Sequence, residues 1–501
     1  MLIPCPRHRA DRFAPSPWLP DHPDRLRLEQ RLAPDHLART LGDAVGRLDL
    51  AALLASYGPT GSPAHRPDAM LAVVLYELRA GRHSPAQWYR DARELEPVRW
   101  LLRGAEPSRS CWYAFRDRVA DYLDDWLRQV LAQAQQQGMT PARRGALDGT
   151  TVAANAARRR LANEATLERR ASALEQVEHG TAPTPRPGWI APTACGRRRQ
   201  QRQLQKARQC MAQRQASNRG KRASKRRPPE KIVLSIVDPE AAVSYDKEGV
   251  YRPLYNVQIL DDLDSPLVLA YDVFAQPNDA GLLGPMVQRA RQALGHGLDT
   301  LLADTAYAGG ADVAVAERAG VRLYAPLPAE PQMPAKQLPK SAFTWLPEAQ
   351  TYQCPHGQRL VAAGTARQKR SGSDTVLLHQ YRCPPEHCRG CPLQAACTPS
   401  PEKGRTISRS EHEEVLDALR QRMADADAKP LYRLRAQTVE LVNADWKGHR
   451  NLRRFSGRGR KRARCQVGLL VLAHNLFTVI QGEARPKPDQ PPIPTTATAP
   501  P

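Results

Sequence analysis

Short apolar runs rich in β-branched residues alternate with amphipathic helical patterns in the middle of the chain. The strand patterns lie at Gly145–Ala153, Lys231–Val237, Tyr255–Leu260, Pro266–Phe274, Thr300–Asp304 and Val321–Ala325. Helical patterns lie at Ala280–Leu294, where Asp279 is the expected cap, and at Ala311–Ala319. Strands that alternate with helices in this way predict one α/β sheet with partly parallel strands.

Helical spacing dominates on both sides of this region. From Leu28 to Leu131 the apolar residues recur every three or four positions, which predicts an all-α N-terminal domain. Ser84 and Ser108 stand where helices should begin, and four tryptophans at helical positions are expected to fill the core (Trp88, Trp100, Trp112 and Trp126). DNA contact by one of them is the minority alternative. Further helices are predicted at Glu411–Ala426, Tyr432–Trp446 and Val467–Gln481.

These patterns divide the chain into five parts. The helical domain covers 1–135, the first part of the α/β core 141–330, a cysteine-bearing insertion 331–410, the second part of the core 411–482, and a Pro-rich tail expected to be disordered 483–501. Within the core, residues 156–230 form a basic insert. It is either two helices around a loop or chain that becomes ordered on a partner.

Positive charge indicates a polyanionic partner, most simply nucleic acid. The 501 residues include 74 basic and 51 acidic side chains, a formal net charge of +23. Fourteen of the basic residues lie between Gly196 and Lys231, together with the single acid Glu230. No run approaches the roughly 18–20 apolar residues that cross a bilayer, and Met1–Arg9 lacks the apolar stretch of a signal peptide. The expected compartment is the cytoplasm, with no membrane contact.

Five cysteines cluster in the 331–410 insertion. Cys383, Cys388, Cys391 and Cys397 are closely spaced, and Cys354 lies some thirty residues earlier. Short-spaced thiols favour a structural zinc site, with Cys354, Cys383, Cys388 and Cys391 as the preferred ligands. Free thiols are the plain alternative, and catalytic use of a thiol is the least favoured one.

Three carboxylates stand where a site could form. Asp148 lies in the first strand, Asp304 ends a later strand, and Glu440 lies in a late helix. Carboxylates at strand ends, joined by one from a neighbouring helix, suit Mg²⁺ or Mn²⁺ and two-metal phosphodiester chemistry. From spacing alone, solvated surface acids are the commoner explanation.

Several short motifs, in a fixed order, resemble the DDE transposases of bacterial insertion sequences. They are Leu147-Asp148-Gly149-Thr150, Tyr255-Asn256-Val257-Gln258, Asn278-Asp279, Ala303-Asp304-Thr305-Ala306-Tyr307, Glu440 seven residues before Lys447, and the run from Arg454 to Leu476. The similarity covers about residues 50 to 480, and a subgroup of the family is similar in carrying cysteines before the glutamate.

The resemblance implies a ribonuclease-H-like mixed sheet core that cleaves DNA at transposon ends and joins the 3′-hydroxyls to target DNA. Asp148, Asp304 and Glu440 would bind Mg²⁺ or Mn²⁺. Tyr432, Arg435 and Lys447 correspond to residues that contact DNA, although Arg435 lies five residues before Glu440 where the family has four. Arg453, Arg454 and Arg458 in the basic stretch that follows are further expected DNA contacts.

The implied partners are terminal inverted repeats and target DNA, and two ends cut together imply a homodimer on DNA close to the bacterial nucleoid. Because Glu440 and Lys447 are seven residues apart, they share one helix face.

An inactive DNA-binding protein derived from a transposase is the main alternative. A nuclease that hydrolyses DNA without joining it is the weaker one. The N-terminal helical domain is the expected reader of the DNA ends.

Overall fold

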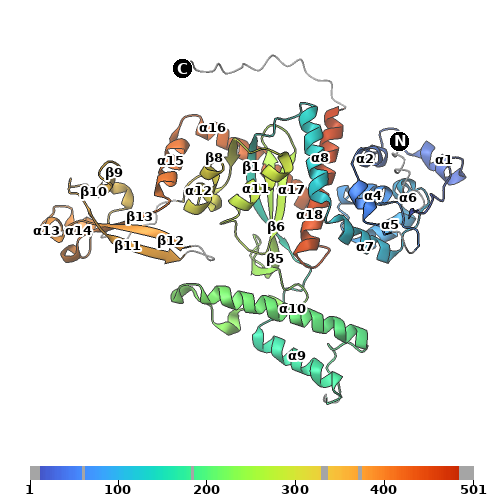
Figure 1. Ribbon diagram of the computed structural model, residues 1–501, viewed down its shortest axis with the longest axis horizontal. Coiled ribbons are helices and arrows are strands. Elements are labelled where there is room, and N and C mark those ends of the chain that lie inside the picture. The colour runs from blue at the N-terminus through green and yellow to red at the C-terminus, as the bar shows by residue number, and fades with distance from the viewer. Residues whose placement is uncertain (1–11, 59–61, 182–184, 329–336, 370–374, 484–501) are drawn as a thin grey trace.

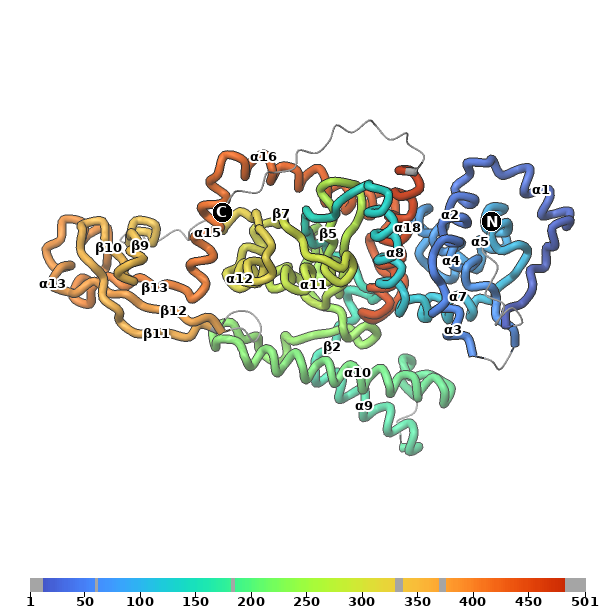
Figure 2. The backbone as a smooth tube through the Cα atoms, turned by 45° about the horizontal axis from the view of Figure 1, so that its top comes forward, coloured from blue at the N-terminus to red at the C-terminus, as the bar shows by residue number. Residues whose placement is uncertain are grey.

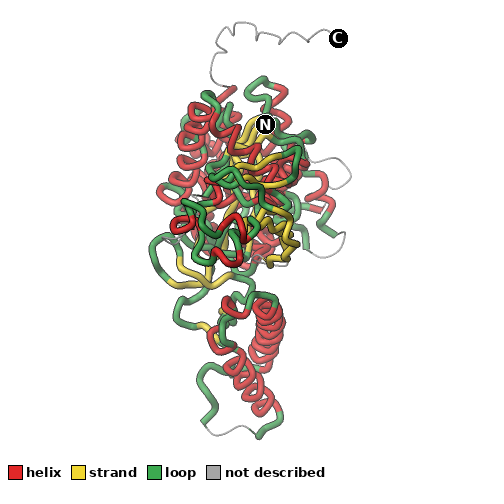
Figure 3. The backbone as a smooth tube through the Cα atoms, turned by 90° about the vertical axis from the view of Figure 1, so that its left-hand side faces the viewer, coloured by secondary structure: helices red, strands yellow, loops and turns green. Residues whose placement is uncertain are grey.

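The computed structural model describes residues 12–58, 62–181, 185–328, 337–369 and 375–483. A central mixed sheet has a helical unit on one side, a cysteine-bearing unit on the other and a helical arm below it (Figure 1). Seen end on, the arm projects well away from the body (Figure 3). The predicted tail lies almost entirely outside the described residues.

The sheet mixes antiparallel and parallel pairs. Its strands are β1 (Arg144–Ala153), β4 (Ala242–Tyr245), β5 (Tyr251–Asp262), β6 (Val268–Phe274), β7 (Thr300–Leu302) and β8 (Arg322–Tyr324). β5 pairs antiparallel with β1, β4 and β6, whereas β7 pairs parallel with β1 and with β8. The prediction of an α/β fold with a partly parallel sheet is confirmed.

Both faces of the sheet are covered, because alternate strand residues point to opposite sides. On one side, α8 (Leu123–Gln136), α11 (Leu283–Leu294) and α18 (Arg460–Glu483) pack with β6 or with each other. On the other side, Val439 of α17 (Val439–Gly448) packs with Ala146 of β1 and Leu302 of β7. Asp148, two residues after Ala146, shares that second face.

The N-terminal helices form the predicted helical unit beside the sheet (Figure 1). They are α1 (Pro23–Arg31), α2 (Leu37–Gly46), α3 (Ala51–Ala55), α4 (Pro67–Arg79), α5 (Pro85–Glu94), α6 (Glu96–Leu102) and α7 (Arg109–Val119). Ser84 and Ser108 cap α5 and α7 as expected. Trp88, Trp112 and Trp126 are fully buried, which confirms their core role, while Trp100 is only half-buried.

The basic insert folds as two helices around a loop, the first of the two predicted alternatives. α9 (Glu164–Glu178) and α10 (Ala194–Arg219) pack through their own small core, which includes Leu167, Leu174 and Leu204 (Figure 2). The strand predicted at Lys231–Val237 is shortened to β3 (Leu234–Ser235), which pairs with β2 (Leu161–Ala162) at the base of the arm. Its assignment to the central sheet was therefore wrong.

The cysteines lie in a unit of small sheets and short helices. Its elements are β9 (Thr344–Leu346), β10 (Thr351–Gln353), β11 (Val361–Lys369), β12 (Thr375–Arg382), α13 (Pro385–Cys388), α14 (Gln394–Cys397) and β13 (Thr406–Ser410). β11, β12 and β13 form a three-stranded antiparallel sheet. Trp345, Tyr352 and Tyr381 contact one another in tilted and edge-to-face arrangements in the small core of this unit.

The chain then returns to the central sheet through helices. α15 (Glu413–Ala424) contacts α12 (Gly310–Arg318), but the single helix predicted at Tyr432–Trp446 is broken into α16 (Ala428–Arg433), a 3₁₀ turn at Leu434–Gln437, and α17. Thr438 causes the break locally, because its hydroxyl donates to the carbonyls of Leu434 and Arg435 and competes with the regular ladder.

α18 is the central helix between the N-terminal unit and the sheet. Among the described residues it alone is long and apolar enough to cross a membrane by composition, over Arg460–Gly482, but 72% of that window is buried inside the protein. It contacts α4, α8 and β6. These contacts are those of a core helix.

Candidate active site

Asp148 is held by two side chains from the C-terminal part of the chain. Arg435 Nη2 donates to Asp148 Oδ1 at 2.8 Å, and Asn443 Nδ2 donates to Oδ2 at 2.9 Å. The side chains of Asp148 and Arg435 are 13% and 12% exposed, so the ion pair is largely desolvated. The break before α17 makes this contact possible, since it turns Arg435 toward β1.

Glu440 lies beside the Arg435 guanidinium, and the charge of Asp304 acts on Tyr432 and on Asp148. Arg435 Nη1 is 3.5 Å from Glu440 Oε1, in the first turn of α17. Asp304 follows β7 and accepts from the backbone N–H of Ala306 at 2.8 Å. Charges on Asp148, Asp304 and Glu440 all raise the pKa of Tyr432, after the larger effect of burial. The three predicted acids are thus brought to one region, beside two of the predicted DNA-contacting residues.

Burial raises the pKa of the Asp148 carboxyl, and the charge of Asp304 adds to that rise. Arg435, Lys247 and the backbone N–H of Gly149 act in the opposite direction. A carboxylate in this setting gains from any cation placed against it, because its own hydration has been removed.

The donor set has the chemistry of a divalent-cation site. Asp148 and Glu440 both contact Arg435, the charge of Asp304 acts on the Asp148 pKa, and Asn443 Oδ1 is buried without a hydrogen-bond partner among the described residues. Oxygen donors of these kinds suit Mg²⁺ or Mn²⁺. In the arrangement described, no three His, Cys, Asp or Glu side chains come close enough to hold one ion. Arg435 supplies the positive charge between Asp148 and Glu440.

A buried polar network next to Asp148 leaves no room for a side chain at Gly149. Tyr307 donates to Gln258, and the side-chain amides of Gln258 and Asn256 both donate to Asp279 Oδ1 at 2.7 Å. A Cβ on Gly149 would overlap Asp279 and Gln258. Four of the sequence motifs therefore meet in one network. The prediction that Asp279 caps the following helix was wrong: α11 begins at Leu283, and the carboxylate serves the strand amides instead.

Asp261 is a fourth carboxyl near the site that sequence reasoning missed. It pairs with Ala146 across β1 and β5, is 2% exposed, and neither oxygen has a hydrogen-bond partner among the described residues. Burial, followed by the charges of Asp148 and Asp262, raises its pKa well above the usual range. No sequence signal indicated its burial, because Asp261 directly follows the strand predicted at Tyr255–Leu260, in a run with Asp262 and Asp264 that is typical of a turn.

The predicted basic residues follow the acids along the chain. Lys447 is half-buried on α17, and burial lowers its pKa, with Lys247 and Arg453 acting in the same direction and Asp148 and Glu248 opposing them. Arg453, Arg454 and Arg458 are exposed in the segment after α17. Arg453 donates to the Lys447 carbonyl at 3.2 Å. A basic surface thus leads away from Asp148.

The cysteines approach one another at the far end of the molecule. Cys383 and Cys388 are buried in one cluster, with Cys354 and Cys397 packed against it. Burial, a hydrogen bond with Cys388 and the nearby thiols raise the pKa of Cys383 to about 12. Cys397 is absent from the preferred ligand set. Burial raises the pKa of its thiol, and the nearby thiols of Cys388, Cys354 and Cys391 add to that rise. The thiols nevertheless do not form a group tight enough to hold an ion among the described residues.

A mixed sheet that gathers acids from its first strand, a later strand end and a C-terminal helix defines an α/β protein with a carboxylate-lined site. Residues 353–480, about a quarter of the chain, match the family model described as "Transposase DDE domain". This span therefore carries a transposase DDE domain, which belongs to a family of polynucleotidyl transferases, and the predicted resemblance to DDE transposases is confirmed over it. The matched span includes Glu440, the cysteines and most of α18. Comparison with curated proteins and with solved structures gives no significant match.

Proposed function

We propose that the chain is an active transposase that cleaves DNA at the ends of an insertion sequence and joins the freed 3′-hydroxyls to target DNA. The proposal is supported by the contacts of Asp148 and Glu440 with Arg435, and by the charge of Asp304 acting on Asp148 and Tyr432. Transposases act on DNA, and the net charge of +23 supports a DNA partner.

A ribonuclease-H-like core is the proposed scaffold. The strand order β6-β5-β1-β7-β8, antiparallel as far as β1 and parallel beyond it, supports this assignment. So does the position of the acids, one inside β1 and one directly after β7. The carboxyl ends of parallel strands are the usual place for ligands in such sheets.

Asp148, Asp304 and Glu440 would hold Mg²⁺ or Mn²⁺, with Asn443 Oδ1 as a further donor. Bound divalent ions supply charge stabilisation for the attacking and leaving oxygens of phosphodiester cleavage. Arg435 keeps Asp148 ionised despite its burial. Lys447, on the same face of α17 as Glu440, would bind the phosphate next to the cleaved bond.

A structural zinc ion is proposed for the cysteine-bearing unit. Cys354, Cys383 and Cys388 would be ligands, with Cys391 or Cys397 as the fourth. The proposal is supported by the gathering of four of these cysteines in one cluster, and the small core of this unit gives metal binding a stabilising role.

Terminal inverted repeats and target DNA are the proposed substrates, bound by a homodimer in the bacterial cytoplasm close to the nucleoid. The N-terminal helices are the proposed reader of the ends. The alternative of an inactive DNA-binding derivative has no supporting observation, because a pure binding protein has no need to gather three acids beside Arg435.

The deciding experiment uses Asp304→Asn on a duplex that carries the element's end in Mn²⁺ or Mg²⁺. We expect cleavage to fall at least about a hundredfold, since metal-assisted charge stabilisation contributes several kcal/mol, while affinity for the end stays within about twofold. Asp299→Asn, an exposed acid near the other end of β7, is the matched control. Cleavage that survives in Asp304→Asn at saturating metal contradicts the proposal.

A further inference from the structure

A groove lies where the helical arm joins the core. It has a volume of about 780 Å³ and is bounded by the chain after β1, by α9 and α10, by the β3–β4 connection and by the segment after α17. Its floor is apolar and includes Leu161, Leu204 and Ile236. None of these residues takes part in the carboxylate site.

All the charged side chains that line the groove among the described residues are positive. Its charged residues are Arg159, Arg160, Arg170, Arg454 and Arg458, and no lining residue among those described is acidic. Arg159 and Arg160 are exposed, and neither side chain has a hydrogen-bond or ion-pair partner in the described part of the chain. Guanidinium groups left in this state are available to a phosphate.

Other contacts hold the groove in shape. Arg454 Nη2 donates to the Ala156 carbonyl at 2.9 Å, and Arg458 Nε donates to the Asn155 carbonyl at 3.3 Å. The Gln200 amide donates to the Trp189 carbonyl at 2.6 Å, which ties the loop before α10 to that helix. Arg170 lies 5.1 Å from the half-buried Trp189 ring. These contacts preorganise the walls of the groove, from which the Arg159 and Arg160 side chains extend.

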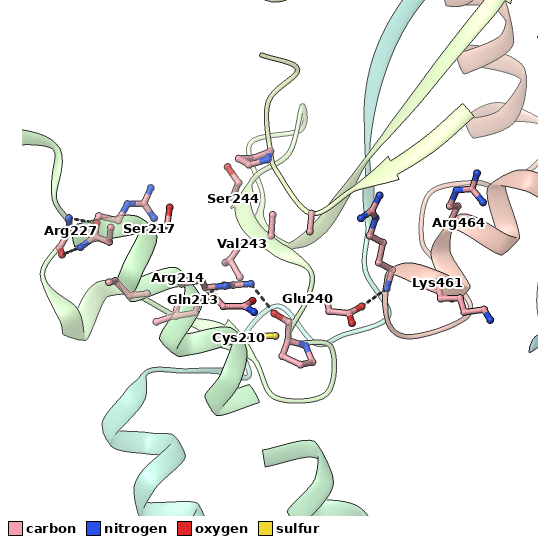
Figure 4. Close-up of a pocket in the computed structure, with 18 of the residues that line it drawn as sticks. Cys210, Gln213, Arg214, Ser217, Arg227, Glu240, Val243, Ser244, Lys461 and Arg464 are labelled. Carbon is pink, nitrogen blue, oxygen red and sulfur yellow. Dashed lines mark hydrogen bonds between the residues drawn. The ribbon is translucent and has the colours of Figure 1, made fainter. Parts of the chain in front are cut away.

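A larger cavity nearer the C-terminal end of α10 differs in charge (Figure 4). It has a volume of about 900 Å³, is lined by Asp121 and Glu240 as well as by bases, and most of its cations are already bound within the protein. Arg214 donates to the carbonyls of Val233, Pro239 and Ala241, and Lys461 pairs with Asp121 at 2.6 Å. The arginine groove is thus the stronger anion site of the two.

The groove is continuous with the carboxylate site along β1. Ala153, the last residue of β1, donates to the Arg453 carbonyl and accepts from Phe455, so the arginine segment is joined to the strand end. Ala153 lies five positions after Asp148 in the strand, a span of about 17 Å at roughly 3.3 Å per residue. B-DNA rises about 3.4 Å along its axis per base pair, so a duplex at the acids would reach the groove within about five base pairs.

We propose that this groove binds the phosphate backbone of duplex DNA flanking the site of cleavage, with Arg159 and Arg160 as its principal contacts. The location relative to cleavage rests on the proposed function, whereas the binding itself does not. This proposal gives the arm a role in DNA binding, because α9 and α10 form one wall of the groove.

The test measures affinity of the full chain for a 30-base-pair duplex in EDTA, across a range of salt concentrations. The test variant is Arg159→Ala with Arg160→Ala. The matched control is Arg318→Ala with Arg322→Ala, which removes the same charge from two exposed arginines on α12 and β8, outside the groove. Arg159→Lys with Arg160→Lys preserves the charge.

We expect the groove variant to bind about tenfold more weakly at 0.1 M salt. The slope of log affinity against log salt should fall in magnitude by about 1.8, corresponding to two lost phosphate contacts. The control and the lysine variant should stay within about twofold of the wild type. An unchanged slope in the groove variant, or an equal loss in the control, overturns the proposal. Because the assay contains no divalent metal, failed cleavage by the wild type would refute the proposed function without affecting this result.

Discussion

Arg435 links the segment before α17 to β1, with Nη2 2.8 Å from Asp148 Oδ1 across 287 residues of sequence. The same guanidinium reaches Glu440 at 3.5 Å. A carboxylate as buried as Asp148 needs a compensating cation, and Arg435 is that cation in the structure described. The ion pair therefore holds the 434–448 segment in place against β1.

Replacing Arg435 with alanine should destabilise the chain by about 3 kcal/mol in EDTA, because a buried carboxylate loses its partner. Urea unfolding at neutral pH measures this. Addition of Mg²⁺ should stabilise Arg435→Ala more than the wild type, since the ion replaces the lost charge. Arg433→Ala, an exposed neighbour on α16, should change stability by less than about 0.5 kcal/mol. An equal Mg²⁺ effect on both Arg435→Ala and the wild type would argue against a cation site at Asp148.

Gly149 gives a second prediction. Gly149→Ala should cost about 2 kcal/mol, because its Cβ forces apart Asp279 and Gln258, which hold the buried network. Gly297→Ala is the matched control, since a Cβ there meets nothing within 4 Å. Urea midpoints of the two variants decide the point. Equal stability of Gly149→Ala and Gly297→Ala would mean that the network yields without cost.

The local sequence pattern predicted those helices and strands in which a single pattern of apolar residues runs along the whole element. β5 was found from the sequence because it contains a run of apolar and β-branched residues, all buried, and α11 because helical spacing runs through it. Thr438 could not be identified as a break, because the apolar spacing continues across it while its hydroxyl competes for the carbonyls of Leu434 and Arg435. The contact between Arg435 and Asp148 depends on that break. Its geometry is set by tertiary packing and leaves no local signal.

The cysteine unit predicts a bound metal that can be assayed directly. The purified chain should contain about one zinc ion per molecule, and chelation should lower its melting temperature. Cys388→Ser should lose the metal, because Cys388 is buried against Cys383 and Cys354 in one cluster. Cys195→Ser, an exposed thiol on α10, should retain it. Substoichiometric zinc in the wild type, prepared without chelators, would leave the thiols as a plain hydrophobic cluster.

Asp261 predicts a pH dependence of stability with a defined sign. The pKa of its carboxyl is raised well above the value of about 3.9 expected in the unfolded chain, so the folded state binds a proton that the unfolded state releases. Its contribution to stability is therefore fully present below about pH 4 and declines as the pH rises, by at most about 1.4 kcal/mol per pH unit, until the folded pKa is reached. Asp261→Asn removes this decline.

Urea unfolding in EDTA at pH 5, 6 and 7 should show that Asp261→Asn gains stability relative to the wild type with each step. Asp261→Leu, which also cannot titrate, should show the same relative slope whatever its absolute stability. Asp148 titrates in all three proteins, and its direct contribution largely cancels in the comparison. If the difference between variant and wild type is flat from pH 5 to 7, the Asp261 carboxyl is ionised in the folded chain, and a cation or water must then satisfy its two buried oxygens.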